Sequence, residues 1–320
     1  MTVLEGIQKS TEFLAKKDVD SPRLQAELLL AHVLKLPRMK LYLNFERVLT
    51  DSETNSFREL VKRRAQREPL QHITGSTSFC GFEIAVNRHV LVPRPETEVL
   101  AELGWQFLGR ADLPVGQGNE KTALDFGTGS GCIAIALAAK APAAKILAID
   151  VSPEALEIAK QNAAKNNVAD RIEFLQGDSL QSLVGRVTPG APFAEPAERR
   201  ARSDAPYPAQ DAVTFDLIIS NPPYIPTAEI ATLEPEVRDY DPRGALDGGR
   251  DGLDFYRRFA AEARPFLKRG GKIMLEFGDG QAAAIQNIFT AQNWIVEAIG
   301  EDYTQRQRIL IAKTTTDKHG

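Results

Sequence analysis

The spacing of apolar and polar residues predicts helices over the first seventy residues. Residues 50–53 (Thr-Asp-Ser-Glu) form a capping-box pattern, and neither Gly nor Pro interrupts the chain from there to Arg67. Ser21 followed by Pro22 offers a capping hydroxyl and a preset φ for another helix. One face of that helix is expected to carry three apolar residues: Leu24, Leu28 and Ala31.

A loose alternation of apolar and polar residues over 76–92 predicts a β-hairpin. We place its turn at residues 87–89 (Asn-Arg-His). Two prolines then stiffen residues 93–98, from which a helix is expected to run to about Leu108.

From residue 122 onward, short apolar strands alternate with helical segments, which is typical of the α/β class and of a doubly wound parallel sheet. Ser152 as N-cap and Pro153 at the first helical position mark the start of one helix. The last two strands are expected to form an antiparallel pair. In chain order, the predicted strands and helices cover residues 122–126, 132–140, 145–150, 153–166, 172–176, 215–220, 272–277, 281–291, 294–299 and 308–312.

One segment fits neither periodicity. Residues 187–213 hold five prolines and an arginine cluster, so we interpret them as a flexible surface insertion between the third and fourth strands. The chain is thereby predicted to consist of a helical domain over 1–72, a linking hairpin over 73–94 and a doubly wound domain over 95–320.

Composition narrows the class of protein. Of 320 residues, 43% are apolar and 26% are charged, which is typical of a globular chain. Charged residues interrupt the apolar runs, so no membrane span is expected, and the first residues lack a signal-peptide pattern, which favours a cytoplasmic protein. Cys80 and Cys132 stand alone, so neither a disulfide framework nor a metal site built on cysteines is expected.

The charge is distributed unevenly along the chain. Residues 1–70 carry 13 basic and 10 acidic side chains, whereas the whole chain carries 39 and 43. The remaining part is therefore acidic and lacks the basic surface that binding to a nucleic-acid backbone requires. The small basic excess of residues 1–70 fits an ordinary solvated bundle, and it also fits a docking surface for an acidic partner.

A glycine-rich turn follows the first predicted strand. Glycines let the backbone turn tightly, so that its N–H groups face a ligand at a helix N-terminus. A dinucleotide-binding fingerprint would have its third glycine at position 132, where Cys132 stands. The GxGxG spacing resembles that of class I S-adenosylmethionine-dependent methyltransferases. The candidate cofactor-binding residues of this turn are Phe126, Gly127, Thr128, Gly129, Ser130 and Gly131.

Two further strand ends support this resemblance. Asp150 ends the second strand, 23 residues after Gly127, where a carboxylate can accept hydrogen bonds from both hydroxyls of an adenosine ribose. Helix capping beside Ser152 is the alternative role for this acid. Asp178 and Ser179 follow the third strand, at the position from which methyltransferases of this class usually contact the adenine.

The most specific motif follows the fourth strand and consists of Asn221, Pro222, Pro223 and Tyr224. Each proline holds the preceding residue extended, so the motif predicts a stiff elbow at the sheet edge where α/β folds bind ligands. An amide or exocyclic amine nitrogen is a poor nucleophile because its lone pair is delocalised. The Asn221 side-chain oxygen and the Pro222 carbonyl would orient it and favour the developing positive charge. Tyr224 offers an aromatic wall; a simple turn after a strand is the alternative.

Neighbouring residues narrow the choice among possible substrates. Residues 92–98 (Val-Pro-Arg-Pro-Glu-Thr-Glu) are similar to the (I/V)PRPxTE signature of the release factor glutamine methyltransferases, the HemK/PrmC family. Ser179 and the insertion depart from the family pattern. Ribosomal-protein glutamine methyltransferases usually lack the Pro-x-Thr-Glu half of this loop. The other segments that resemble the family are residues 71–75, 245–249, 251–257 and 275–278.

The resemblance implies a Rossmann-like methyltransferase that modifies the glutamine side chain in the Gly-Gly-Gln motif of class I peptide chain release factors. It implies that Asn221 and Pro222 hold the amide, that Tyr224 and Leu91 pack around the glutamine stem, and that the helical domain helps to hold the release factor. S-adenosylmethionine is the implied cofactor; no metal, membrane or direct nucleic-acid contact is expected.

Two alternatives remain beside this interpretation. A methyltransferase for an exocyclic amine of a nucleic-acid base shares the Asn-Pro-Pro-Tyr motif, but it would need a basic groove. A catalytically silent binding protein with the same fold would have no need to keep the glycine turn, Asp150 and that motif together.

Overall fold

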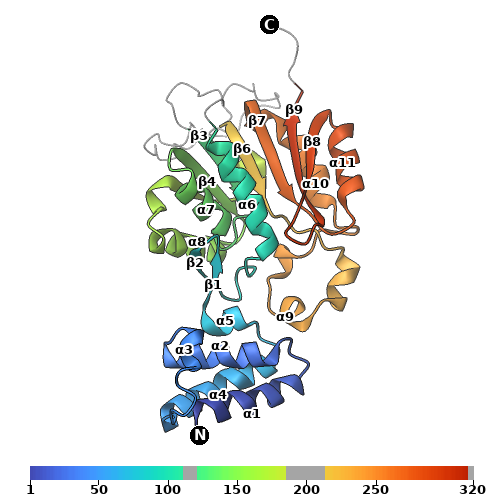
Figure 1. The fold of residues 1–320 in the computed structure, drawn as a ribbon. Coiled ribbons are helices and arrows are strands. Elements are labelled where there is room, and N and C mark those ends of the chain that lie inside the picture. Colours follow the sequence, from blue (N-terminus) through green and yellow to red (C-terminus); the bar gives the residue numbers. More distant parts are fainter. Residues whose placement is uncertain (111–120, 185–212, 316–320) are drawn as a thin grey trace, which may run out of the picture.

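A computed structural model describes residues 1–110, 121–184 and 213–315 of the chain (Figure 1). All but the last residue of the expected insertion at 187–213 lie outside these described residues. Within them, no helix is long and apolar enough to cross a membrane. The same residues contain no group of three or more His, Cys, Asp or Glu side chains that could hold a metal ion.

The N-terminal part is a bundle of short helices with its own apolar core around Leu14, Leu29 and Phe57. The predicted capping box is confirmed, because the Thr50 hydroxyl accepts a hydrogen bond from the Glu53 N–H and the Glu53 carboxylate accepts one from the Thr50 N–H. The helices are α1 (Val3–Ala15), α2 (Pro22–Leu34), α3 (Arg38–Leu41), α4 (Asp51–Ala65) and α5 (Leu70–Thr74).

The start of α2 differs from the prediction. Pro22 does occupy the first turn, but Ser21 adopts a left-handed conformation with φ of 48° and its side chain caps nothing. A capping hydroxyl needs extended backbone to reach the N–H groups of the first turn, so this prediction was wrong. The expected apolar face was only partly right, since Ala31 is buried but Leu28 is half-buried and Leu24 is exposed. Contacts with α1, α3 and α4 instead bury Ala26, Glu27, Leu29, Leu30 and Ala31.

A hairpin of β1 (Ser76–Phe79) and β2 (Phe82–Ala85) follows the bundle. Its turn is Cys80 and Gly81, not residues 87–89 as predicted. Both turn residues have positive φ, 50° and 82°, and such a two-residue turn matches the twist of the flanking strands. The Glu98 carboxylate holds this turn by accepting a hydrogen bond from the Cys80 N–H at 2.9 Å.

The C-terminal part is built on a seven-stranded sheet in the order β5-β4-β3-β6-β7-β9-β8. The predicted doubly wound sheet is confirmed, with parallel pairing from β5 to β7 and an antiparallel final pair. One strand, β7, begins earlier than expected. The strands are β3 (Lys121–Phe126), β4 (Ala144–Asp150), β5 (Ile172–Gln176), β6 (Phe215–Ser220), β7 (Leu267–Glu276), β8 (Trp294–Glu301) and β9 (Gln307–Thr314).

Helices cover both faces of this sheet (Figure 1). Alternate residues of β3 face the two layers: Ala123 belongs to one apolar cluster and Leu124 to the other. The first layer contains α6 (Pro95–Leu108), α7 (Cys132–Lys140) and α8 (Pro153–Lys165), and the second contains α10 (Asp254–Glu262) and α11 (Ala282–Ala291).

The strand order reverses beside β3, because the chain passes from β3 to β4 and β5 and then returns to β6 on the other side. Crevices for ligands form at such switch points, outside the carboxyl ends of the strands. The turn after β3 and the motif after β6 therefore lie at one crevice.

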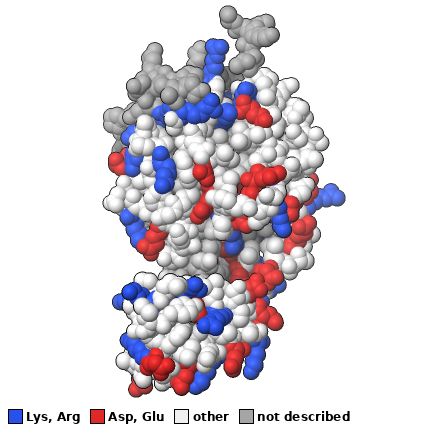
Figure 2. All heavy atoms as spheres, viewed as in Figure 1, with Lys and Arg blue, Asp and Glu red and all other residues white. Residues whose placement is uncertain are grey.

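Ion pairs join the bundle to the segment around α9 (Pro235–Arg238). The Arg64 guanidinium donates to the Glu236 carboxylate at 2.7 Å, and Arg67 donates to Glu234 at 2.7 Å. The Tyr240 hydroxyl donates to the Gln66 carbonyl at 3.0 Å. Elsewhere on the face in Figure 2, basic and acidic side chains are interspersed over the bundle.

Asn162 of α8 ties the hairpin to the glycine turn, and it is fully buried. Its side-chain oxygen accepts from the Ala85 N–H at 2.8 Å, while its Nδ2 donates to the Ala85 and Ser130 carbonyls at 3.0 and 2.9 Å. We expect Asn162→Ala to lower the free energy of unfolding by about 2–4 kcal/mol, because three backbone groups, one buried and two partly buried, lose their partner. Urea unfolding measures this loss. Gln161→Ala, on the exposed side of α8, is the control; an equal loss in both variants would contradict the prediction.

Candidate active site

Two cavities meet at the carboxyl edge of the sheet. The larger has a volume of about 370 Å³ and borders the ends of β3, β4 and β6. The smaller has a volume of about 250 Å³ and extends toward β7 and β9. Leu91, Arg94, Asn221 and Ala245 line both. A group bound in one cavity is therefore adjacent, at Asn221, to a group bound in the other.

The glycine turn forms a wall of the larger cavity. Gly127 and Gly129 have φ of 73° and 53°, and no atom lies within 4 Å of the position that a Cβ would take at either residue. Bare backbone therefore faces open space there, which suits the close approach of a ligand. The Gly127 and Thr128 N–H groups both donate to the Ile149 carbonyl at 2.8 Å and so fix the turn to β4.

Gly131 has a different role from the first two glycines. A Cβ at this position would lie 3.0 Å from the Ala159 Cβ, so a glycine allows α7 to pack closely on α8. Neither Gly131 nor Ser179 lines the larger cavity; Ser179 precedes a short 3₁₀ turn. The candidate cofactor residues that do line it are Phe126, Gly127, Thr128, Gly129, Ser130, Asp150, Asp178 and Asn221.

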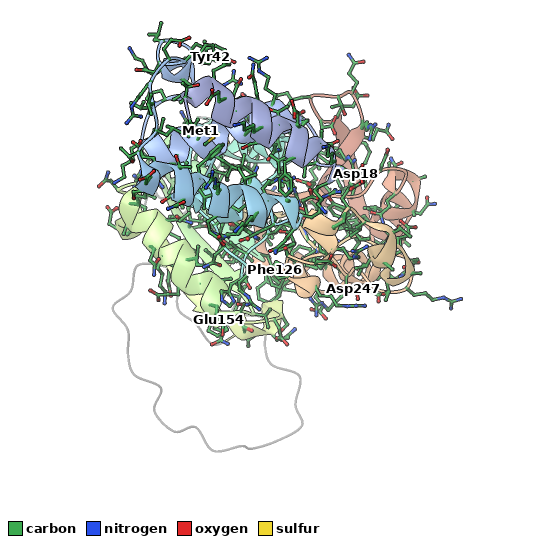
Figure 3. All side chains as sticks on the ribbon, turned by 90° about the horizontal axis from the view of Figure 1, so that it is seen from below. Met1, Asp18, Tyr42, Phe126, Glu154 and Asp247 are labelled. Atoms are coloured by element: carbon green, nitrogen blue, oxygen red, sulfur yellow. The ribbon has the colours of Figure 1, made fainter. Side chains whose placement is uncertain are left out.

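Asp150 lies at the end of β4 with both carboxylate oxygens engaged by backbone. One accepts from the Gly129 N–H at 2.8 Å and the other from the Ser152 N–H at 2.9 Å. Each oxygen keeps a further lone pair for a ligand hydroxyl. The cap of α8 is Ser152, whose hydroxyl accepts from the Ala155 N–H, so Asp150 is not needed for that role. Figure 3 labels Phe126, which ends β3, and Glu154 in the first turn of α8.

Asp125 holds the glycine turn through hydrogen bonds. The sequence alone did not indicate this role. The Asp125 Oδ2 accepts from the Thr128 hydroxyl at 2.6 Å and from the Ala134 N–H at 3.1 Å. The side chain is fully buried, and burial raises its pKa to about 7. An acidic residue inside an otherwise apolar strand was the available signal, because such a group is buried only when backbone or hydroxyl donors meet it.

The motif after β6 begins at the junction of the two cavities. The Ser220 hydroxyl donates to the Phe126 carbonyl at 2.6 Å, which joins the ends of β6 and β3. Asn221 donates through Nδ2 to the Thr97 hydroxyl at 3.0 Å, and the same hydroxyl acts to lower the pKa of the neighbouring Glu276 carboxyl. The amide nitrogen of Asn221 is therefore engaged with protein, while Oδ1 has no protein donor among the described hydrogen bonds.

Pro222 and Pro223 line the larger cavity, whereas Tyr224 lines the smaller one. The Tyr224 carbonyl accepts from the Gln281 side chain at 2.9 Å, and a Cβ at Gly252 would lie 2.2 Å from the same carbonyl oxygen. Close packing thus fixes the position of the tyrosine. Burial raises the pKa of Tyr224 to about 12, so its ring is a neutral wall at physiological pH.

The charged residues at the start of α6 have separate roles. Arg94 donates to the buried Asp241 at 2.7 Å, Glu98 holds the hairpin turn, and Glu96 lines the smaller cavity. Glu96 and Glu98 make no hydrogen bond to each other among the described contacts, and Arg94 and Glu98 instead order the neighbouring loops.

The residues of the larger cavity fit S-adenosylmethionine. The bare glycine backbone admits a bulky group, the fixed Asp150 carboxylate matches a ribose diol, and Phe126 and Phe255 add apolar surface for a base. Asn221 lies at the side that opens to the smaller cavity. The fold is that of the class I methyltransferases.

Comparisons with known proteins agree with this arrangement. Residues 5–75 match the family described as PrmC N-terminal domain, and residues 109–187 match that described as ribosomal protein L11 methyltransferase (PrmA). A release factor glutamine methyltransferase of Chlorobaculum tepidum is 40% identical over 309 residues, which cover 97% of this chain and 96% of that protein. One from Geobacter sulfurreducens is 40% identical and covers 90% and 88%.

Among solved structures, the release-factor-specific protein-(glutamine-N5) methyltransferase of Alicyclobacillus acidocaldarius is similar to this chain. The match covers 70% of this chain and 95% of that one, at 28% identity and a TM-score of 0.40.

Proposed function

The chain belongs to the release factor glutamine methyltransferase family, and from this membership we propose that it methylates the glutamine side-chain amide in the Gly-Gly-Gln motif of class I peptide chain release factors. The observation that carries the proposal is the position of Asn221, which lines both the cavity suited to S-adenosylmethionine and the adjoining smaller cavity. The two reactants would meet at this residue.

In the larger cavity, the backbone of Gly127 and Gly129 and the carboxylate of Asp150 would hold the cofactor, with Asp178 toward the base. S-adenosylmethionine supplies a methyl carbon on a sulfonium: transfer forms an N–C bond and breaks the S–C bond, whose electrons remain on sulfur. The protein has to place that carbon in line with the acceptor nitrogen, because orientation accounts for much of the rate of such a transfer.

Where the two cavities meet, the Asn221 Oδ1 and the Pro222 carbonyl would accept hydrogen bonds from the two N–H groups of the glutamine amide. These contacts orient the nitrogen and stabilise the positive charge that develops on it. Tyr224 and Leu91 would pack around the glutamine stem. A strong general base is not required, because the nitrogen readily loses a proton once it is alkylated.

The charge pattern supports a protein substrate over a nucleic-acid base. Basic and acidic groups are interspersed on the bundle, as Figure 2 shows for one face, and the chain as a whole carries a net charge of -4. Binding to a nucleic-acid backbone depends on concentrated positive charge. The helical bundle, with its ion pairs to the α9 segment, would serve to hold the release factor beside the smaller cavity.

Labelled S-adenosylmethionine tests the proposal. The protein is incubated in parallel with a purified class I release factor, with its Gly-Gly-Ala variant and with duplex DNA. We expect label on the release factor with the intact Gly-Gly-Gln motif alone, because only it offers the glutamine amide. Label on DNA, or equal label on the Gly-Gly-Ala variant, would contradict the proposed substrate.

A further inference from the structure

We propose that Thr97 and Glu276 are positioning residues that hold the Asn221 amide with its oxygen toward the substrate. The inference rests on the proposed function, in which this oxygen accepts a hydrogen bond from the glutamine amide. Asn221 directly follows β6, Thr97 lies in the first turn of α6 and Glu276 ends β7, so three elements distant in sequence meet here.

An asparagine amide has two ends of nearly the same shape but opposite hydrogen-bonding character. With the NH₂ group toward the cavity, Asn221 would present a donor to the donor groups of a glutamine amide, and the substrate would be repelled. A fixed partner on the protein side is needed to select the other orientation. Thr97 is that partner, since its hydroxyl oxygen lies 3.0 Å from the Asn221 Nδ2.

A hydroxyl alone does not select the orientation, because it can donate as well as accept. The Thr97 hydroxyl has one proton, and its interaction with Glu276 acts to lower the pKa of that carboxyl, which means that the proton is directed at the carboxylate. A carboxylate only accepts, so Thr97 donates to Glu276 and can only accept from Asn221. The direction of these successive hydrogen bonds is therefore set at Glu276. This leaves Oδ1 of Asn221 free for the substrate.

Burial protects the contacts of Thr97 and Glu276 from competition by water. Thr97 and Glu276 are each 2% exposed, so water has little access to replace either contact. The second carboxylate oxygen of Glu276 has no hydrogen-bond partner among the described residues, although Glu276 lines the smaller cavity. A buried charged group with one oxygen unpaired is costly, which points to a role beyond stability.

The protonation state of Glu276 controls the direction in which Asn221, Thr97 and Glu276 donate to one another. A protonated Glu276 could donate to Thr97, which would free the Thr97 proton for Oδ1 of Asn221 and allow the amide to reverse. Burial raises the pKa of Glu276 to about 7, against the opposing effect of nearby arginines. The titratable and charged groups that face it are Arg94, Glu96, Tyr224, Tyr256 and Arg308.

A matched pair of substitutions at Thr97 tests the inference. Thr97→Val keeps the volume but removes the hydroxyl, whereas Thr97→Ser keeps the hydroxyl. We expect Thr97→Val to lower kcat with release factor by about 100-fold, as for other misplaced reactive groups, and Thr97→Ser to stay within about threefold of the unmodified protein. The KM for release factor, the cofactor affinity and the melting temperature should change little. Near-normal kcat in Thr97→Val, or an equal loss in Thr97→Ser, would overturn the inference.

A second variant separates positioning from packing. The unmodified protein should lose kcat as the pH falls below about 7, whereas Glu276→Gln should have a low kcat without this acidic limb. If the pH profile of kcat for Glu276→Gln showed an acidic limb with the same midpoint, the role of Glu276 would be refuted. If the unmodified protein fails to methylate release factor, the proposed function fails instead.

Side-chain amide NMR tests the inference without activity. With ¹⁵N-labelled asparagine, the Asn221 NH₂ signals are identified by their absence in Asn221→Ala. We expect them to exchange slowly with solvent in the unmodified protein and in Thr97→Ser, and rapidly in Thr97→Val. Equal exchange in all three would mean that Thr97 does not hold the amide.

Discussion

Replacing Asn221 by alanine should lower kcat for release-factor methylation by about a thousandfold or more, because the substrate amide loses the side-chain acceptor that orients it and stabilises its developing charge. The larger cavity keeps its glycine turn and Asp150 in this variant, so the affinity for S-adenosylmethionine should remain within a few-fold. Single-turnover transfer of labelled methyl measures the first quantity, and calorimetric titration measures the second.

Asn44→Ala is the matched control for this variant. Asn44 lies in the bundle, and its side chain donates only to the Lys40 carbonyl among the described contacts. Its loss should leave both kcat and cofactor affinity unchanged. Near-normal turnover in Asn221→Ala would remove Asn221 from the reaction, and a joint loss of cofactor affinity would assign it to cofactor binding instead.

The second large effect is expected at Asp150. Asp150→Ala should raise the dissociation constant for S-adenosylmethionine by about 100-fold or more, because two charge-assisted hydrogen bonds to the ribose are lost. The same substitution removes the acceptor of the Gly129 N–H, which loosens the glycine turn. Calorimetric titration measures the change directly.

Glu154→Ala provides the comparison for Asp150. Glu154 is an exposed acid in the first turn of α8, and its carboxylate contacts the Ser152 hydroxyl. It carries the same charge close to the same cavity, so a general electrostatic effect would appear in both variants. Equal losses of affinity would contradict a specific contact between Asp150 and the ribose.

Local features were predictable where the physical cause lies within a few residues. The cap at Ser152, the capping box at residues 50–53 and the parallel strands follow from side-chain chemistry and periodicity close in sequence. The hairpin was predicted but its turn was misplaced, because both Cys80–Gly81 and residues 87–89 carry turn-forming residues. Ser21 failed for a related reason, since the conformation of a cap depends on how the preceding chain enters the helix.

The sequence by itself determined the order of strands and helices, the glycine turn and the Asn-Pro-Pro-Tyr motif, because these depend on short-range sterics and on residue types at fixed spacing. Only the tertiary structure decided that Gly127 faces open space while Gly131 faces Ala159. It alone brought Thr97 to Asn221 across 124 residues, with Glu276 behind them. Such contacts form only when the sheet closes around its switch point, so no pattern within one segment encodes them.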